Sequence, residues 1–314
     1  MPPRGPYAFE GVNADLLHEV HQTFTGYLFG ALGQNPRWTQ ELAIANDLPV
    51  RGNSAKTKMA SRAFGVHEWI DERVKSKIEH SDFEVTVKRF ANAISLKIDD
   101  LEDEDLNLGQ YRMLIDEMAD DFDEHKHSLF IDLITNGFTG ARGLAYDGQF
   151  FFDSDHPVPN PDGTLGTQSN TLTSAFSSAS FYTAVALMEN IRKPNGLHAN
   201  LTPTHGLFPH ALRSTVEAVL DKQYEANGSN NLLYKRIKPI FDPRLTIRSA
   251  TAWYLIDATK VLKPFFWAPR KQVTPQMSKD AEFEQGFWHW GAYARYNASY
   301  GFYQTMVGST GTTG

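Results

Sequence analysis

Three residues of one short segment, Asp153, Asp155 and His156, are of the types that bind a divalent metal ion. Carboxylate oxygens and imidazole nitrogens suit zinc and divalent transition metals, and His205 or His210 could complete a ligand set. This interpretation predicts a metal-dependent hydrolase. A structural interpretation competes with it, because a loop aspartate commonly caps a turn and a histidine before proline commonly packs into a corner. The spacing matches no closed metal-ligand motif.

Other catalytic arrangements find less support in the sequence. The chain has no cysteine, which excludes disulfides, thiolate metal sites and cysteine nucleophiles. It contains no Gly-x-Ser-x-Gly elbow and no Gly-x-x-x-x-Gly-Lys phosphate loop. His125 and His127 lie among acidic residues, where a solvated helix face is the simpler interpretation. We therefore expect no catalytic residue, no cofactor and no metal.

Aromatic residues offer a third class of function. The run Trp288-His289-Trp290 could stack on sugars or bases, as in a carbohydrate-binding or tail-associated interaction module. Aromatic residues that alternate along a strand belong more often to a core or an interface.

Charge and composition exclude some classes of partner. The formal net charge is −7, and the segment from Asp99 to Glu124 carries twelve acidic residues and one basic residue, Arg112. A protein that binds nucleic acid is expected to have a basic stripe on its surface. The strong negative charge of this segment therefore argues against wide contact with DNA phosphates. No stretch approaches the roughly 18 apolar residues of a membrane span, and the N-terminal residues form no apolar signal-peptide core. We expect a soluble intracellular protein.

Hydrophobic periodicity predicts the helices that would position these residues. Apolar residues recur at three- and four-residue steps over 13–32, which is typical of an amphipathic helix. A longer apolar stripe predicts a helix from about 108 to 136, with acidic residues on its other face and Gly137 at its end. Further helices are expected at 178–192 and after Pro209.

Alternation of apolar and charged residues predicts three half-buried strands, at 74–78, 83–87 and 94–98. Strands this charged make a thin sheet, so something must cover its apolar side. Residues 46–62 before them are polar and basic, and we expect them to be irregular.

The second half of the chain alternates between helices and strands. Strands are expected at 232–241, 253–256 and 264–267, and two more around Asn297. In the long connection before this half, Asp147-Gly148 suits a hairpin turn. The last residues, from Gly308, are typical of a tail that is disordered in a free monomer.

Several separated segments share their order along the chain with one known family. They are Glu68-Trp69-Ile70, Phe83-Glu84-Val85-Thr86-Val87, Leu133-Ile134-Thr135-Asn136-Gly137-Phe138, Tyr146-Asp147-Gly148-Gln149-Phe150-Phe151 with His156-Pro157 and Ser169-Asn170, Trp253-Tyr254-Leu255-Ile256-Asp257, and Gly291-Ala292-Tyr293-Ala294-Arg295 with Tyr300-Gly301-Phe302. Together they resemble the Mu-like bacteriophage major head subunit family over about 14–309. The segment that begins at Tyr146 is the sharpest match.

The resemblance implies an α+β chain with the Hong Kong 97-type major capsid fold. The implied parts are an N-terminal arm with an amphipathic helix (1–62), an extended β loop (63–98), a spine helix with a peripheral domain (99–172), an axial α/β domain (173–280) and C-terminal strands that return to the peripheral and axial domains (281–314).

It also implies a structural protein that is not an enzyme. Copies would self-assemble as hexamers and pentamers of a capsid lattice into an icosahedral phage shell around double-stranded DNA, bound without sequence specificity. A scaffolding protein, a portal and a decoration protein would be partners, and no membrane would be involved. The expected location is the virion capsid, after assembly in the bacterial host cytoplasm.

In that fold the extended loop would lie on a neighbouring subunit, which would supply the missing cover for the strands at 73–98. We expect this loop to approach the acidic 99–124 segment of the neighbour. We also expect acids left over on the long helix, Asp116, Asp120 and Asp123, to repel packaged DNA. The predicted inter-subunit contacts are Arg73, Lys75, Lys77, Ile78, Val85, Val87, Lys88 and Arg89.

Overall fold

The computed structural model describes residues 14–60, 80–97, 108–160, 164–193, 196–224, 228–247, 249–278 and 286–312. The helices are α1 (Ala14–Ala31), α2 (Trp38–Glu41), α4 (Leu108–Thr135), α5 (Ser178–Glu189) and α6 (Arg213–Leu220), with short 3₁₀ helices η1 (His210–Leu212), η2 (Pro243–Ile247) and η3 (Tyr303–Thr305). None of the helices in these ranges is long and apolar enough to cross a membrane. The predicted helices at 13–32 and 108–136 are confirmed within a residue at each end.

The strands pair into a four-stranded sheet, a five-stranded sheet and two two-stranded ribbons. They are β1 (Ala45–Asp47), β2 (Ser54–Ala60), β3 (His80–Thr86), β4 (Lys88–Lys97), β5 (His156–Pro159), β6 (Leu165–Gln168), β7 (Thr171–Leu172), β8 (His205–Phe208), β9 (Lys238–Phe241), β10 (Trp253–Ile256), β11 (Phe265–Ser278), β12 (Phe287–Tyr300) and β13 (Met306–Ser309). The four-stranded sheet has the order β1-β11-β12-β4, and the five-stranded sheet has the order β7-β13-β10-β8-β9.

The chain divides into two compact units. The first takes its described residues from 1–37, 88–126 and 270–296, and the second takes them from 38–87, 127–269 and 297–314. Three elements, α4, β11 and β12, contribute residues to both units. Each unit has packing of its own.

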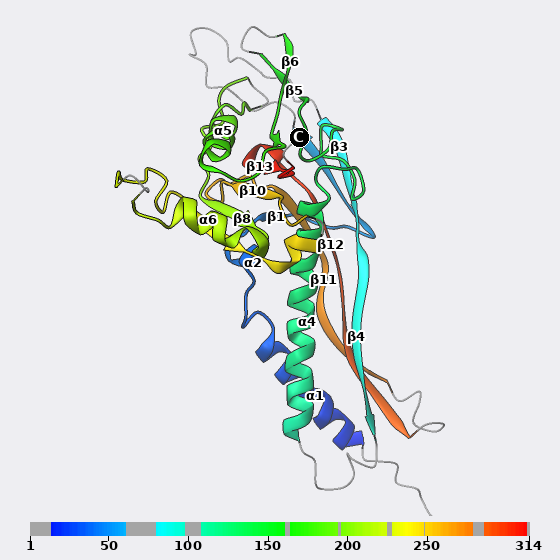
Figure 1. The fold of residues 1–314 in the computed structure, drawn as a ribbon. Helices are drawn as coiled ribbons and strands as arrows, with labels where there is room; N and C mark the ends of the chain where they lie inside the picture. Colours follow the sequence, from blue (N-terminus) through cyan, green and yellow to red (C-terminus); the bar gives the residue numbers. More distant parts are fainter. Residues whose placement is uncertain are drawn as a thin grey trace, which may run out of the picture. The chain divides into compact units, whose positions relative to one another are not determined.

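In the first unit, two helices pack on one face of an antiparallel strand pair. Figure 1 shows α1 beside the first half of α4, with β4 and β12 running next to them. The fully buried Trp290 of β12 meets Phe24 of α1 edge-on at 5.5 Å between ring centroids, and Phe24 contacts Tyr111 of α4 at 5.9 Å. Even-numbered residues of β12 therefore face the helices, so its odd-numbered residues face the opposite way.

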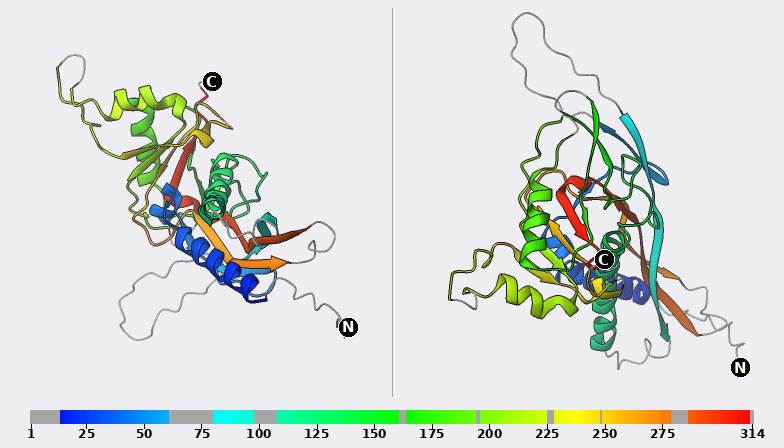
Figure 2. Two further views of the ribbon diagram at one scale, coloured as in Figure 1. Left: turned by 90° about the horizontal axis from the view of Figure 1, so that it is seen from below. Right: turned by 45° about the horizontal axis from the view of Figure 1, so that its top comes forward.

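In the second unit, the five-stranded sheet has both faces covered, and Figure 2 shows α5 and α6 lying on the same side of it. All four residues of β10 are buried for this reason. Trp253 and Leu255 pack with α5 and α6, whereas Tyr254 and Ile256 pack with the last turns of α4. A strand buried on both faces reads as a continuous apolar run, which is why the sequence predicted β10 correctly.

The strands expected to lack cover are anchored in their own chain. β3 pairs with β2, a strand within the segment that we expected to be irregular, and Ala55 faces Val85 in this register. Val85 and Val87 are 3% and 8% exposed and pack with Leu48 and Phe266. β4 pairs along its whole length with β12. The expectation of an uncovered sheet was wrong for these residues, and the predicted strand at 74–78 lies outside the described residues.

Two further expectations about the C-terminal part were wrong. Residues around Asn297 form one continuous strand, β12, in which the Asn297 amide donates to the Thr86 carbonyl at 2.7 Å. The expected tail begins inside β13, where Ser309 is fully buried. Gly308 lies so close to Phe152 that an added Cβ would stand 2.9 Å from that ring.

Candidate metal site and assembly surfaces

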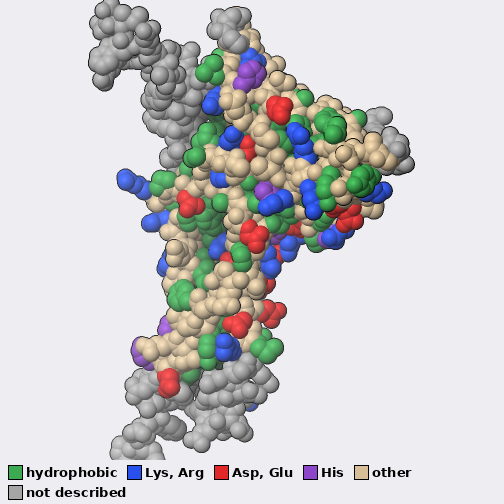
Figure 3. All heavy atoms as spheres, turned by 90° about the vertical axis from the view of Figure 1, so that its left-hand side faces the viewer, with side chains coloured by type: hydrophobic (Ala, Val, Ile, Leu, Met, Phe, Trp, Pro, Cys, Tyr) green, Lys and Arg blue, Asp and Glu red, His purple; other side chains and the backbone are tan. Residues whose placement is uncertain are grey.

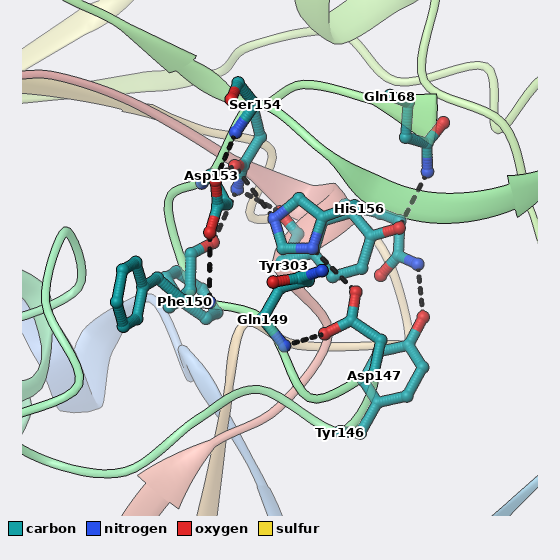
Figure 4. Close-up of polar contacts among 12 residues, drawn as sticks. Tyr146, Asp147, Gln149, Phe150, Asp153, Ser154, His156, Gln168 and Tyr303 are labelled. Atoms are coloured by element: carbon teal, nitrogen blue, oxygen red, sulfur yellow. Dashed lines mark hydrogen bonds and ion pairs between the residues drawn. The ribbon is translucent and has the colours of Figure 1, made fainter. Parts of the chain in front are cut away.

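His156, the first residue of β5, is fully buried in a polar corner of the second unit. Its Nδ1 donates to a carboxylate oxygen of Asp147 at 2.6 Å, and its Nε2 lies 3.2 Å from Oδ1 of Asn170. The imidazole stacks on the ring of Tyr303, with 3.5 Å between the ring centroids and 5° between the planes. Figure 4 shows the imidazole of His156 beside Asp147 and over the ring of Tyr303.

The side chain of Asn170 connects the polar corner around His156 to nearby backbone groups through hydrogen bonds. Its amide nitrogen donates to the carbonyl groups of Phe151, Tyr303 and Met306, and its Oδ1 accepts the N–H of Asp153. Both ring nitrogens of His156 therefore have oxygen partners within the chain. This satisfied arrangement is that of a packed corner and leaves neither nitrogen for a metal ion.

The two aspartates beside His156 do not join it in a metal site. The Asp153 carboxylate accepts the backbone N–H groups of Phe150 at 3.2 Å and Ser154 at 2.7 Å, as a loop-capping residue does. Asp155 is exposed, and its hydrogen bond with Asp153, together with the negative charge of Asp153, raises the pKa of its carboxyl. Across the described ranges, no cluster of three or more His, Cys, Asp or Glu residues is arranged to hold a metal ion.

The other histidines have separate structural roles. His205 Nδ1 lies 2.9 Å from the Thr204 hydroxyl, and burial followed by the charge of Lys238 lowers its pKa. His210 lies beside Phe241 at 6.4 Å between ring centroids. His125 contacts the Tyr296 hydroxyl through Nδ1 at 2.9 Å, and burial lowers its pKa.

His127 forms a second buried histidine–carboxylate pair, in the second unit. Its Nε2 lies 2.8 Å from an Asp242 carboxylate oxygen, which also accepts the indole N–H of Trp38 at 2.8 Å, and its Nδ1 lies 3.0 Å from the Thr39 hydroxyl. Burial alone would raise the pKa of the Asp242 carboxyl. Hydrogen bonds from His127, Trp38 and the N–H of Arg244 overcome this effect and lower it to about 2.

The tryptophans of the third alternative cannot act as a stacking platform in this structure. Trp288 and Trp290 are both fully buried. They belong to the inward face of β12, so the alternating aromatic pattern is a core pattern.

The acidic face of α4 is partly neutralised by its own unit. Figure 3 shows acidic side chains, in red, over the region of α1 and α4. Asp123 is buried and accepts the N–H of Gly33 at 2.7 Å. The three acids expected to repel DNA each have a basic neighbour: Arg112 for Asp116 at 3.9 Å, Arg37 for Asp120 at 2.8 Å and Lys126 for Asp123 at 3.1 Å. These cations weaken the field that the three carboxylates would direct at DNA.

The predicted inter-subunit contacts fall into three groups. Lys88 and Arg89 are exposed at the start of β4. Val85 and Val87 are buried against their own chain, so in this structure they anchor the hairpin instead of meeting a neighbour. The remaining four, Arg73, Lys75, Lys77 and Ile78, lie outside the described residues.

Sequence reasoning missed the residues that complete the histidine corner. The sequence predicts only a turn at Asp147 and assigns no role to Tyr303. The turn itself is present, since Gly148 has a φ of 84° and the Gln149 N–H donates to the Asp147 carboxylate. No local spacing shows that Asp147, Asn170 and Tyr303 meet around one imidazole.

Comparison with known proteins shows which family this chain belongs to. A family model described as Mu-like prophage major head subunit gpT matches residues 17–183 and 246–313. The chain belongs to this family. The Mu-like prophage FluMu major head subunit of Haemophilus influenzae is 27% identical over 300 residues, which cover 93% of this chain and 72% of that protein. The major capsid protein of Escherichia phage Mu is 36% identical over 119 residues, 37% of this chain and 37% of that protein.

Solved structures with the same fold come from assembled capsids and particles. A chain of the procapsid of bacteriophage JBD30 has a TM-score of 0.59 and 24% identity, covering 96% of the head subunit and 77% of that chain. A virus-like particle from Pyrococcus furiosus has a TM-score of 0.53 and 7% identity, covering 93% of the head subunit and 99% of that chain. The predicted α+β fold of the Hong Kong 97 type is confirmed.

The family decides between the functions considered from the sequence. A major head subunit is a structural protein of the phage head, so the prediction of a capsid protein that is not an enzyme is confirmed. The hydrolase alternative finds no support, and the geometry around His156 explains why its residues resemble a metal site.

Proposed function

We propose that the head subunit assembles with its own copies, as hexamers and pentamers, into an icosahedral shell that encloses double-stranded DNA. Its family and its fold support this proposal. Assembly in the bacterial cytoplasm would involve a scaffolding protein and a portal, and a decoration protein could bind the finished shell. DNA would be enclosed without sequence-specific contacts, because the acidic residues of α4 offer no basic stripe.

The β2–β3 hairpin is the observation that carries this proposal. Its base is fixed in the second unit, where Ala55 and Val85 are 1% and 3% exposed. Seven register pairs extend from there, from Ser54↔Thr86 to Ala60↔His80. An isolated two-stranded hairpin is marginally stable in water, so one this long gains from a surface beyond its anchor. A neighbouring subunit would supply that surface.

We infer the domain division predicted from the sequence, with one change. The hairpin begins at Ser54, so the extended loop would start there and not at 63. The α4 helix would be the spine, the β4–β12 sheet would belong to the peripheral domain, and the α5–α6 sheet would be the axial domain. Of the predicted inter-subunit contacts, Lys88 and Arg89 remain the described candidates.

A shortened hairpin tests the proposal. Lys56 and Glu84 are register partners, so replacing residues 57–83 with an Asn-Gly turn would keep the buried Ala55↔Val85 pair. The variant should fold, with a melting temperature within a few degrees of the wild-type subunit, but should form no particles by electron microscopy. Wild-type particle yield from this variant would show that the hairpin is not the strap between subunits.

A further inference from the structure

The face of the β4–β12 pair that points away from α1 and α4 carries basic residues at one end. Arg89 and Arg295 stand directly opposite each other in the register of the two strands. Both have odd numbers and therefore lie on the outward face. Like charges directly opposite on a sheet are destabilising unless an anion compensates them. Within the described ranges, Arg89 has no carboxylate partner.

Tyr293 extends this basic end toward β11. The Lys271 ammonium lies 4.2 Å from the centroid of the Tyr293 ring and donates to its hydroxyl, and the Arg89 guanidinium lies 5.6 Å from the same centroid. The hydrogen bond from Lys271, followed by the charges of Lys271, Arg89 and Arg295, lowers the pKa of the Tyr293 phenol. The environment of this phenol is thus one that favours negative charge.

Small residues lie beside the basic end on the same face. Ala91 and Ala93 of β4 are exposed, and Ala93 pairs with Gly291 of β12. A Cβ added to Gly291 would stand 2.5 Å from the Asn92 carbonyl oxygen, so the strand leaves no room for a side chain there. A hollow of about 580 Å³ is bordered by these residues and by Tyr293 and His289 of β12. Its border also includes polar residues of the end of β11 and, from the helix side of the sheet, His18 and His21 of α1. Ala91 and Ala93 therefore form a low apolar patch between the polar border of the hollow and the basic end of the face.

The exposed stripe of α4 has the complementary character. Leu114, Glu117 and Asp121 follow one another at three- and four-residue steps and so share a helix face. Leu114 is 45% exposed, its neighbour Met113 is 73% exposed, and both acids are exposed. One carboxylate oxygen of Asp121 accepts the side-chain amide of Asn92 in the same chain at 2.9 Å. The stripe therefore places an apolar group at one end and carboxylates at the other.

We propose that the Leu114–Glu117–Asp121 stripe of one copy docks on the outward face of the β4–β12 sheet of the next copy. This inference rests on the proposed shell-building function. Leu114 and Asp121 are about 10 Å apart along α4. Ala93 and Arg89 are about 13 Å apart along β4. With Leu114 over Ala93, the carboxylates of Glu117 and Asp121 reach the basic end.

The contact joins two different surfaces of the same chain. Each copy presents one stripe and one sheet face, so the contact is head-to-tail. Such a contact closes into a ring when the rotation between copies allows it.

Disulfide trapping tests the contact directly, because the natural chain has no cysteine. Two variants, Arg89→Cys and Asp121→Cys, are mixed before assembly and oxidised, so that a mixed disulfide can form only between copies. We expect a covalent dimer on a non-reducing gel from the mixture and none from either variant alone. The matched control pairs Asp121→Cys with Arg236→Cys, another exposed arginine, and should give none.

Charge exchange provides the second measurement. Arg89→Glu combined with Lys271→Glu should reduce particle yield at least tenfold, and Asp121→Arg in the same chain should restore part of it. If the double variant does not fold, the trapping result alone decides. The inference would be overturned if the mixture of cysteine variants formed particles at normal yield without the mixed disulfide. It would also be overturned if the Arg89→Glu, Lys271→Glu variant formed particles at normal yield but with altered genome content, because the basic end would then bind DNA phosphate. If the shortened hairpin abolished particles and the charge exchange did not, the docking contact would be wrong while the proposed function would still stand.

Discussion

Asp242 is a single buried carboxylate that makes the stability of the subunit depend on pH. Its pKa is lowered to about 2 in the folded chain, against about 4 in an unfolded chain. A carboxyl with a lowered folded pKa stabilises the fold above its unfolded pKa, and this contribution is lost as the pH falls from about 4 to 2. We expect Asp242→Asn to reduce the free energy of unfolding at pH 7 by about 2 kcal/mol.

The measurement is urea unfolding of the subunit at pH 7, 4 and 2. Asp242→Asn should show a smaller loss of stability between pH 4 and 2 than the wild-type chain. Asp221→Asn, at an exposed position that ends α6, is the control and should follow the wild-type curve. Equal acid sensitivity of the Asp242 variant and the wild-type subunit would contradict the assignment.

His156 shows what sequence reasoning can and cannot resolve at the scale of a residue. The types and spacing of Asp153, Asp155 and His156 are compatible with metal binding or with a packed corner. Only the fold shows that the imidazole turns toward Asp147 and stacks on Tyr303. Tyr303 follows His156 by almost half the chain, so local pattern carries no information about this contact.

At the scale of elements, β13 holds the C-terminal end of the chain in the second unit. It lies between β7 and β10 in the five-stranded sheet, and all four of its residues are buried. We expect truncation after Thr305 to prevent folding, because it removes this strand and exposes the edge of β10. Truncation after Thr312 should change the melting temperature by no more than a few degrees.

Gly311→Ala is a finer test of the same anchor. Gly311 has a φ of 68°, and an added Cβ would stand 1.9 Å from the Thr251 carbonyl oxygen. The substitution should lower the melting temperature of the full-length chain. A soluble, folded product from truncation after Thr305 would show that β13 is not needed for folding.

The sequence predicted the elements in which buried residues recur at a regular spacing or form one continuous apolar run. The one-sided stripes of α1 and α4 and the apolar run of β10 fall into this class. Two of the strands that the sequence did not predict, β2 and β13, are rich in basic or small residues, and they pair through backbone groups. Their partners, β3 and β10, are distant in the sequence, so long-range pairing overrides local propensity there.

At the scale of the whole molecule, assembly depends on many contacts that are individually weak. An exposed ion pair contributes about 0–1 kcal/mol, so no single pair among those proposed holds two subunits together. Repeated over a closed lattice, such contacts add through effective concentration, while each remains weak enough to break and correct an error. Charge pairs between surfaces of one chain also make assembly sensitive to salt.

We therefore expect the subunit concentration required for assembly to rise several-fold when NaCl increases from 0.1 to 1 M. The Debye length shrinks from about 10 Å to about 3 Å over this range, which screens exposed pairs between copies. Light scattering of purified subunit across a concentration series measures the effect. The double variant Arg89→Gln with Lys271→Gln should assemble less well at low salt and respond less to added salt. A concentration requirement that falls as salt rises would show that apolar surfaces, and not these charges, dominate the contacts between copies.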